Sequence, residues 1–288
     1  MILWKDALKW RLNMLDKNTK VVVYGFGKQG SFHTKLMKEY GTKIVGIISR
    51  NNEGEFERIP FYKNLDNVKA DFCIIFVPAN FAKNAGLEAL EKNMNLVIIT
   101  EGMKVQDTLE LLEKSKEKNL TVIGPNCPGI INVNESKIGI MPAHIFAKGK
   151  VGIISRSGTL TYEIVNELSK NEIGQSKVFG IGGDMVIGST FVDILKILEE
   201  DKETDKIILI GEIGGSLEEK AAEYIKNNIS KKVVAYIAGR SAPKEKRMGH
   251  AGAIIEGDSG SAESKIRALE NAGVKVAKLP SEVVRLLD

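Results

Sequence analysis

Cysteine and proline are scarce in this chain of 288 residues, which has only two cysteines and seven prolines. The two cysteines, Cys73 and Cys127, are too few and too far apart for a disulfide framework or a metal cluster. They are typical of a reducing compartment, so we expect a cytoplasmic protein without a metal site. No apolar run reaches the roughly 18 residues that span a bilayer, and we expect no contact with a membrane.

An excess of charge of one sign is also lacking. The 41 lysines and arginines against 37 acidic residues leave a formal net charge of +4. This balance is too small and too evenly spread to indicate a nucleic-acid-binding protein, although it suits an anionic ligand. Hydrophobic residues make up 43% of the chain, which is enough for the packed cores of one large or two ordinary domains.

The N-terminal residues 1–19 form a separate segment. Apolar residues recur at helical spacing between Trp4 and Leu15, which predicts a short amphipathic helix. The basic residues of this segment would also suit a targeting peptide, but Asp6 and the lack of serine argue against one. We expect an extra helix that packs on the domain or on a partner.

Strands alternate with helices from Lys20 onward, which predicts a parallel, doubly wound α/β sheet. The first strand ends in GFGKQG at residues 25–30, and a helix to about Tyr40 follows. This is a G-x-G-x-x-G turn in the strand–turn–helix context that brings backbone amides close to a phosphate. We expect strands at 20–24, 43–49, 72–77, 96–100 and 121–123, and further helices at 81–92 and 105–118.

The proline- and glycine-rich sequence GPNCPG at residues 124–129 can continue neither a strand nor a helix, so it ends the first domain. A second α/β series, of flavodoxin-like type, begins at Val151. We therefore expect a Rossmann-like domain at 20–129, a connecting segment at 130–150 and a flavodoxin-like domain at 151–288. The second domain should have strands at 151–154, 177–181, 206–210, 232–237 and 274–277. Its first helix should be opened by residues 155–159 and run to about Lys170, and further helices should lie at 191–200, 217–228, 262–271 and 280–287.

A loop of small and basic residues surrounds His250, in the sequence RMGHAGAI at 247–254. Small neighbours leave a ring nitrogen approachable, and histidine is both nucleophilic and partly neutral near pH 7. The preceding cations would hold an anion there. The same loop would also suit an ordinary surface histidine. The cations are Arg240, Lys244, Lys246 and Arg247.

Two other loops of the second domain also follow predicted strands, and such loops gather at the carboxyl edge of an open α/β sheet. Ser157, Gly158 and Thr159 open a helix whose free amides and dipole suit a phosphate, although a serine there also suits an ordinary N-cap. Glu212, in GEIGG at 211–215, would fix the tautomer of an imidazole, or would be an exposed turn residue.

Four segments together resemble the α-subunits of the succinyl-CoA synthetase family, which includes the small subunits of citryl-CoA synthetases. The resemblance covers most of the chain and is near-continuous from Gly124 to Ala277. It implies an N-terminal Rossmann-like domain that binds coenzyme A (CoA) and a flavodoxin-like domain with a phosphohistidine. The four segments are GPNCPG at 124–129, SRSGTLTYE at 155–163, GEIGG at 211–215 and RMGHAGAI at 247–254.

The resemblance implies a three-step reaction. ATP or GTP with Mg²⁺, bound on a separate ATP-grasp β-subunit, phosphorylates His250. The phosphate passes to a small carboxylic acid, and the thiol of CoA then displaces it from the acyl phosphate. The chain itself lacks a G-x-x-x-x-G-K-[ST] loop, which agrees with a nucleotide site on the partner. Succinate is the favoured acid, citrate and malate are alternatives, and the assembly is αβ or α2β2.

Roles for individual residues also follow from the resemblance. His250 carries the phosphate and Glu212 orients the phosphohistidine. Ser157, Gly158 and Thr159 hold the phosphate. Substrate contacts are expected at Tyr162, Asn126 and Pro128. Contacts with CoA are expected at Gly25, Gly27, Lys28, Gln29, Gly30, Arg50, Ile99, Thr100 and Glu101.

The first domain departs from the family pattern, which leaves other functions open. The glycine turn is one residue shorter than the usual G-F-T-G-x-Q-G, and residues 49–52 replace a P-G-K-G-G turn. Arg50 would take the place of the lysine in that turn with a different geometry. An NADP-dependent oxidoreductase would fit the glycine turn and Arg50, but nothing supplies a hydride-transfer site. A non-catalytic CoA sensor is the other alternative, against which the presence of His250 and Glu212 argues.

Overall fold

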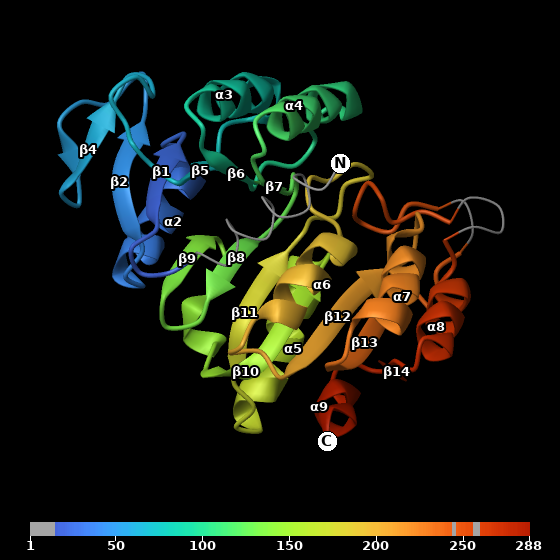
Figure 1. Ribbon diagram of the computed structural model, residues 1–288. Coiled ribbons are helices and arrows are strands. Elements are labelled where there is room, and N and C mark those ends of the chain that lie inside the picture. Colours follow the sequence, from blue (N-terminus) through green and yellow to red (C-terminus); the bar gives the residue numbers. More distant parts are fainter. Residues whose placement is uncertain (1–14, 244–245, 256–259) are drawn as a thin grey trace. The chain divides into compact units, whose positions relative to one another are not determined.

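A computed structural model describes residues 15–243, 246–255 and 260–288 (Figure 1). The predicted N-terminal helix lies outside these residues, apart from Leu15 at its end. The chain divides into two compact units, one of Met1–Met141 with Val186–Gly188, the other of Pro142–Met185 with Ser189–Asp288.

The first unit is built on a sheet that is parallel except at one edge. Its strand order is β3-β4-β2-β1-β5-β6-β7, and only the edge pair β3 and β4 is antiparallel. Counted from β4 in chain order this is 3-2-1-4-5-6, the Rossmann order, which confirms the predicted fold class. The strands are β1 (Lys20–Tyr24), β2 (Lys43–Ile48), β3 (Glu55–Phe56), β4 (Ile59–Tyr62), β5 (Phe72–Ile75), β6 (Asn95–Ile98) and β7 (Val122–Ile123).

Burial explains why these runs form strands. All four residues of β5 and all four of β6 are buried, which is why they read as continuous apolar runs rather than as alternating patterns. The helices α2 (Lys28–Glu39), α3 (Ala79–Glu91) and α4 (Val105–Glu117) pack on this sheet or on one another (Figure 1). The small residues Ala82, Ala85 and Ala89 of α3 let that helix lie close to the strands.

The segment predicted to connect the domains contains an antiparallel hairpin of the first unit. It consists of β8 (Gly129–Asn132) and β9 (Ser136–Gly139), all of whose residues are buried. Lys137 of β9 is fully buried and donates from Nζ to the carbonyl of Met141 at 3.0 Å. Burial lowers the pKa of Lys137 to about 8.

The second unit has a parallel sheet in the order β14-β13-β12-β10-β11. In chain order this is 5-4-3-1-2, the flavodoxin-like arrangement that was predicted. The topological switch point therefore lies between β10 and β12. The strands are β10 (Lys148–Ser155), β11 (Gln175–Gly180), β12 (Lys206–Glu212), β13 (Lys232–Ala238) and β14 (Lys275–Ala277).

The helices of the second unit form two sets. The helices α6, α7 and α8 pack against one another in that order, and α5 packs against α9 (Figure 1). Thr190 begins α6 with a capping box shared with Asp193. The helices are η1 (Ala143–Ile145, 3-10), α5 (Gly158–Lys170), α6 (Phe191–Glu200), α7 (Leu217–Asn228), α8 (Ala262–Asn271) and α9 (Glu282–Leu287).

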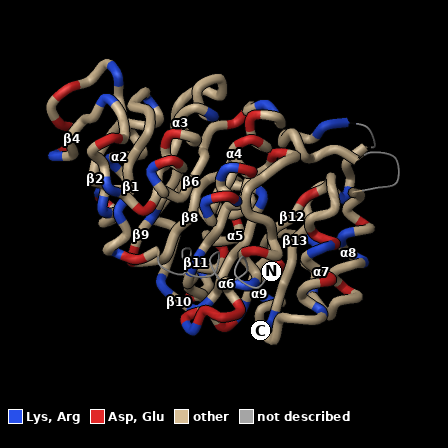
Figure 2. The backbone as a smooth tube through the Cα atoms, turned by 45° about the horizontal axis from the view of Figure 1, so that its top comes forward, with Lys and Arg blue, Asp and Glu red and all other residues tan. Residues whose placement is uncertain are grey.

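Charges of both signs are interspersed along the helices and turns of each unit (Figure 2). Of the helices in the described part of the chain, none combines the length and the apolar character needed to cross a bilayer.

Candidate functional site

Two adjacent strands of the second unit bring the predicted catalytic loops together. β10 and β12 are hydrogen-bonded in parallel, with Ser155 level with Ile210, so both strands end at the same edge of the sheet. Glu212 is the last residue of β12 and is buried. The loop after β10 begins with Arg156, whose amide donates to the carbonyl of Ile210 at 3.1 Å.

The imidazole of His250 lies on this edge. Its Nδ1 is 2.8 Å from Oε2 and 3.0 Å from Oε1 of Glu212, and the ring is partly exposed. Gly183 makes room for the ring, because a Cβ on Gly183 would lie 2.3 Å from Cγ of His250. The amide of Gly252 donates to the carbonyl of Gly183 at 3.0 Å, which holds the His250 loop on the loop after β11.

This geometry selects one tautomer of His250. An ionised carboxylate can only accept, so Nδ1 carries the proton and Nε2 of the neutral ring keeps its lone pair. The hydrogen bond to Glu212 raises the pKa of His250, against a smaller opposing effect of burial. The pair can therefore stabilise a positive ring and can present Nε2 as a nucleophile once the ring is neutral.

The three residues predicted to hold phosphate open helix α5. Ser157 is its N-cap and accepts from the amide of Leu160 at 3.4 Å, so the N-cap reading is also satisfied. Ser157 is buried, Gly158 is half-buried and Thr159 is exposed. Arg156 connects this helix start to the catalytic pair, because its Nη2 is 3.4 Å from Oε1 of Glu212.

The predicted substrate contacts are divided between the units. Tyr162 is half-buried on α5, in the second unit. Asn126 and Pro128 lie in the loop after β7, in the first unit, where the amide of Asn126 donates to the carbonyl of Thr100 at 2.9 Å. Of the basic residues before His250, Lys244 lies outside the described residues, and Arg240 donates to the carbonyl of Ala277 at 3.0 Å.

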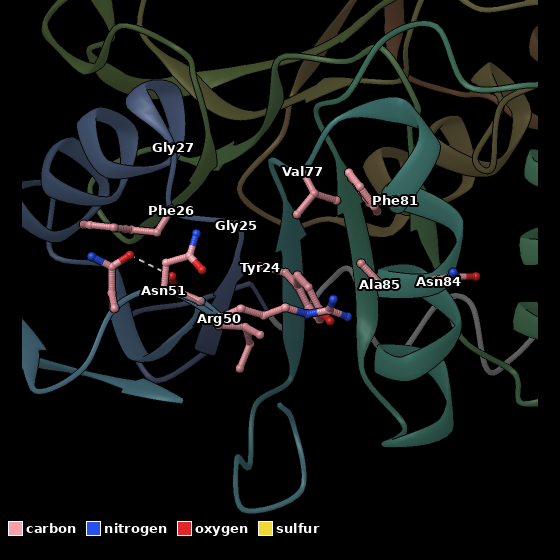
Figure 3. Close-up of a pocket in the computed structure, with 13 residues that line it drawn as sticks. Tyr24, Gly25, Phe26, Gly27, Arg50, Asn51, Val77, Phe81, Asn84 and Ala85 are labelled. Atoms are coloured by element: carbon pink, nitrogen blue, oxygen red, sulfur yellow. Dashed lines mark hydrogen bonds between the residues drawn. The ribbon is translucent and has the colours of Figure 1, made fainter. Parts of the chain in front are cut away.

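A pocket of about 370 Å³ opens at the carboxyl ends of β1 and β2 in the first unit (Figure 3). Three residues predicted to bind CoA line it, namely Gly25, Gly27 and Arg50. Its lining also includes Val77 and Phe81, which follow β5, so the pocket reaches the switch point between β1 and β5, where ligands bind in open α/β folds. The complete lining is Tyr24, Gly25, Phe26, Gly27, Ile48, Ser49, Arg50, Asn51, Asn52, Val77, Phe81, Asn84 and Ala85.

The shape of the glycine turn explains two of its glycines. Gly25 has a φ of +104°, and a Cβ there would lie 2.8 Å from the side chain of Val77. A Cβ on Gly30 would lie 2.2 Å from the carbonyl oxygen of Gly25. Lys28 and Gln29 begin α2 with Gly30 and do not line the pocket.

The predicted CoA contacts after β6 lie beside the pocket rather than in its lining. Thr100 donates from Oγ1 to the carbonyl of Val77 at 2.7 Å, and Val77 is a lining residue. Ile99 donates its amide to Ile75, and Glu101 is exposed. Of these three residues, Thr100 therefore braces the wall that Val77 forms.

The aromatic and amide side chains of the pocket are not among the residues that the sequence predicts. Phe26 packs edge-to-face on Phe56 at 4.9 Å and on Phe61 at 4.8 Å, as part of one wall. Phe81 is 55% exposed, which is unusual for a phenylalanine and is a signal of a ligand surface. Asn51 and Asn52 stand directly after Arg50, in the segment that replaces the P-G-K-G-G turn of the family. That replacement is the feature of the sequence that could have indicated them.

Tyr24 forms part of the pocket and has an internal partner. Its hydroxyl donates to Oε2 of Glu88 at 2.6 Å, and burial together with that carboxylate raises the pKa of Tyr24. Tyr24 therefore stays protonated at neutral pH and is held in place by α3.

Within residues 15–243, 246–255 and 260–288, no group of three His, Cys, Asp or Glu side chains could hold a metal ion.

Comparison with known proteins assigns a family to each half of the chain. A family model described as a CoA binding domain matches residues 16–102, and one described as CoA-ligase matches residues 154–275. The fold and these matches define a class of α/β proteins that join a CoA-binding domain to a CoA-ligase domain.

Curated relatives narrow that class to one family. The chain is 52% identical over 284 residues to succinate–CoA ligase [ADP-forming] subunit alpha 2 of Archaeoglobus fulgidus, with 95% of this chain and 98% of the relative covered. It is 49% identical over 276 residues to the corresponding alpha subunit of Staphylococcus aureus, with 93% and 91% covered. The chain belongs to the family of succinate–CoA ligase α-subunits, which confirms the resemblance seen in its motifs.

A solved structure shares the fold over almost the whole chain. The ATP citrate lyase of Methanothrix soehngenii, solved in complex with citrate and coenzyme A, has a TM-score of 0.86 and 25% identity to it. The match covers 96% of this chain and 50% of that one, so this chain spans half the length of the lyase chain.

Proposed function

We propose that this chain is the α-type subunit of an acid–thiol ligase that forms ADP or GDP, with His250 as the phosphate carrier and succinate as the favoured acid. The observation that carries the proposal is the contact between Nδ1 of His250 and the buried carboxylate of Glu212 at 2.8 Å. That contact leaves Nε2 available for phosphorylation. Membership of the family of succinate–CoA ligase α-subunits supports succinate as the acid.

The first step is attack of the Nε2 lone pair on the γ-phosphorus of the nucleoside triphosphate. The bond to the bridging oxygen breaks, and the nucleoside diphosphate leaves. Glu212 keeps the proton on Nδ1 and balances the positive charge that the ring gains. The N-terminal amides of α5, with Ser157 and Thr159, would then hold the transferred phosphoryl group.

In the second step a carboxylate oxygen of the acid attacks the phosphorus, the N–P bond breaks and His250 is restored. In the third step the sulfur of CoA attacks the acyl carbonyl, inorganic phosphate leaves with the electron pair of the acyl C–O bond, and the thiol proton passes to the leaving phosphate. We assign CoA to the pocket of the first unit, where Arg50 would meet its phosphates. Tyr162, Asn126 and Pro128 are proposed as contacts of the acid.

The nucleotide and Mg²⁺ are assigned to a partner. Curated relatives are named as the alpha subunit of an ADP-forming ligase, and such a subunit implies a β-subunit. We propose that the β-subunit is of the ATP-grasp type and binds ATP or GTP with Mg²⁺, in an αβ or α2β2 assembly. Mg²⁺ there would neutralise the phosphate oxygens during transfer.

Citrate is the second candidate acid, because the structurally similar lyase was solved with citrate and coenzyme A.

The test uses the chain copurified with its β-subunit and ATP labelled at the γ-phosphate. We expect acid-labile label on His250 that succinate and CoA discharge. Discharge only by citrate or malate would keep the mechanism and replace the acid. A chain that takes up no label beside a competent partner would contradict the proposal and favour a CoA sensor or an NADP-dependent enzyme.

A further inference from the structure

A series of buried charges continues behind the catalytic pair. The side chain of Arg156 is 3% exposed, and those of Glu218 and Lys265 are 0% exposed. Nη1 of Arg156 donates to Oε1 of Glu218 at 3.4 Å, and its Nη2 is 3.4 Å from Oε1 of Glu212. Nζ of Lys265 forms an ion pair with the other oxygen of Glu218. One carboxylate, Glu212, is therefore shared between His250 and this series.

Burying such charges is costly unless each is paired, so their placement needs a reason. The series fixes the turn that follows β12. Arg156 donates to the carbonyl of Gly214 at 3.3 Å, and Lys265 donates to that of Gly215 at 3.0 Å. The amide of Glu212 itself donates to Oε1 of Glu218 at 3.2 Å. Three hydrogen bonds from Arg156, Lys265 and Glu218 therefore hold the backbone around Glu212.

The His250 loop also rests on Arg156. A Cβ on Gly252 would lie 2.6 Å from Nη2 of Arg156, so the loop backbone packs directly on the guanidinium. The same guanidinium thus contacts both the loop that carries His250 and the carboxylate that pairs with it. A planar guanidinium with five donors suits this shared position better than a lysine ammonium would.

We propose that Arg156, held in place by Glu218 and Lys265, is a positioning residue that aims the carboxylate of Glu212 at Nδ1 of the phosphate-carrying histidine. This inference rests on the proposed function of His250 and adds three residues to it. In this proposal Arg156 acts on the histidine through Glu212, and no contact with the phosphoryl group or the acid is assigned to it.

The charges around His250 predict how the pKa of His250 should change when the positioning residues are replaced. Three charged side chains act on the ring: Glu212 at the end of β12, Arg156 after β10 and Asp184 after β11. Arg156 lowers the pKa of His250 and the two acids raise it. Replacing Arg156 by a neutral residue therefore moves the titration of His250 to higher pH, so phosphorylation requires a more alkaline solution. Replacing Glu218 by glutamine leaves Glu212 as the remaining anionic partner of Arg156, so the guanidinium should offset more of the Glu212 charge and move the titration to lower pH.

The first arm measures labelling of His250 from γ-labelled ATP in the αβ complex across a range of pH. We expect R156Q to slow labelling by about 10- to 100-fold, the worth of one charge-assisted hydrogen bond, and to move its pH profile upward. R156K should recover part of the rate. The matched control is K177M, which breaks the buried ion pair of Lys177 with Asp201 elsewhere in the second unit. It should leave the pH profile unchanged.

The second arm needs no phosphoryl transfer and so separates this inference from the proposed function. The chain has three histidines, and an H250N variant assigns the His250 signal in an NMR titration of the full chain. We expect R156Q and E218Q to shift that titration in opposite directions. An R156Q protein that labels and titrates like K177M would overturn the inference, as would shifts of the same sign in the two variants. Failure of the wild-type complex to label, with the opposite shifts present, would instead refute the proposed function alone.

Discussion

The replacement of Glu212 by glutamine tests the catalytic pair most directly. Glutamine has nearly the same size, so the buried site behind it is not emptied, but the charge is lost and the amide can donate. If its NH2 group faces Nδ1, the ring takes the Nε2–H tautomer, and the lone pair needed at Nε2 is gone. The charge-assisted hydrogen bond alone is worth about 1.5–3 kcal/mol, or roughly 10- to 150-fold in rate.

The wrong tautomer makes the expected loss larger. In a serine-protease triad, changing the orienting aspartate to asparagine lowers kcat by about 10⁴-fold for this reason. We therefore expect labelling of His250 in E212Q to fall by about 10²- to 10⁴-fold. The assay is single-turnover labelling of the copurified complex with γ-labelled ATP. A rate within about threefold of the wild type would refute the assignment of Glu212 as the orienting residue.

The same variant has a pH signature. Glu212 raises the pKa of His250, so the pair stabilises the folded protein fully below the ordinary histidine pKa of about 6.5 and loses that contribution as the pH rises through the raised value. In urea melts, the difference in the free energy of unfolding between wild type and E212Q should therefore include a part that is largest in acid and disappears in alkali. Residual labelling by E212Q should have its pH midpoint below that of the wild type. A difference in stability that does not change with pH would contradict the charge pairing.

Three further variants test other parts of the site. H250N should abolish labelling and turnover while the complex still assembles, and turnover above a trace would exclude a phosphohistidine. R50Q should raise KM for CoA by about tenfold, the worth of one charge-assisted contact, with labelling of His250 unchanged; the exposed Arg58 of the same unit provides the control R58Q. G183A places a Cβ 2.3 Å from the imidazole, so the ring must move, and labelling should fall at least tenfold while the CoA KM stays the same.

Much of the fold follows from patterns that the sequence displays directly. Continuous apolar runs such as Phe72–Ile75 mark strands buried on both faces, and their alternation with helices predicts two parallel sheets. The pair β3 and β4 was not predicted, because two strands of two and four residues carry too few positions for a periodic pattern. The two four-residue strands of the hairpin at 129–139 are too short for the same reason, so the sequence predicts only a connecting segment there.

The site could be predicted in part, and the missing part has a physical cause. Loops that follow parallel strands meet at one edge, so sequence order alone brings Glu212 toward His250. Glu218 and Lys265 are 47 residues apart, and their pairing depends on how α7 and α8 pack, which no spacing rule expresses. Phe81 of the pocket was likewise hidden within a helical pattern, where an apolar residue ordinarily indicates the core.

The charges around His250 have to meet two opposing requirements. Nε2 attacks only when the ring is neutral, which calls for a low pKa, whereas the phosphorylated ring is positive and calls for a nearby anion. Glu212 alone would favour the charged ring in the resting protein and reduce the neutral fraction near pH 7. Arg156 offsets part of that effect, because it shares the carboxylate and lowers the pKa of His250. A double variant, R156Q with E212Q, should accordingly titrate closer to an ordinary histidine than either single variant does. A double variant that titrates further from it than R156Q would show that the two side chains do not oppose each other at the ring.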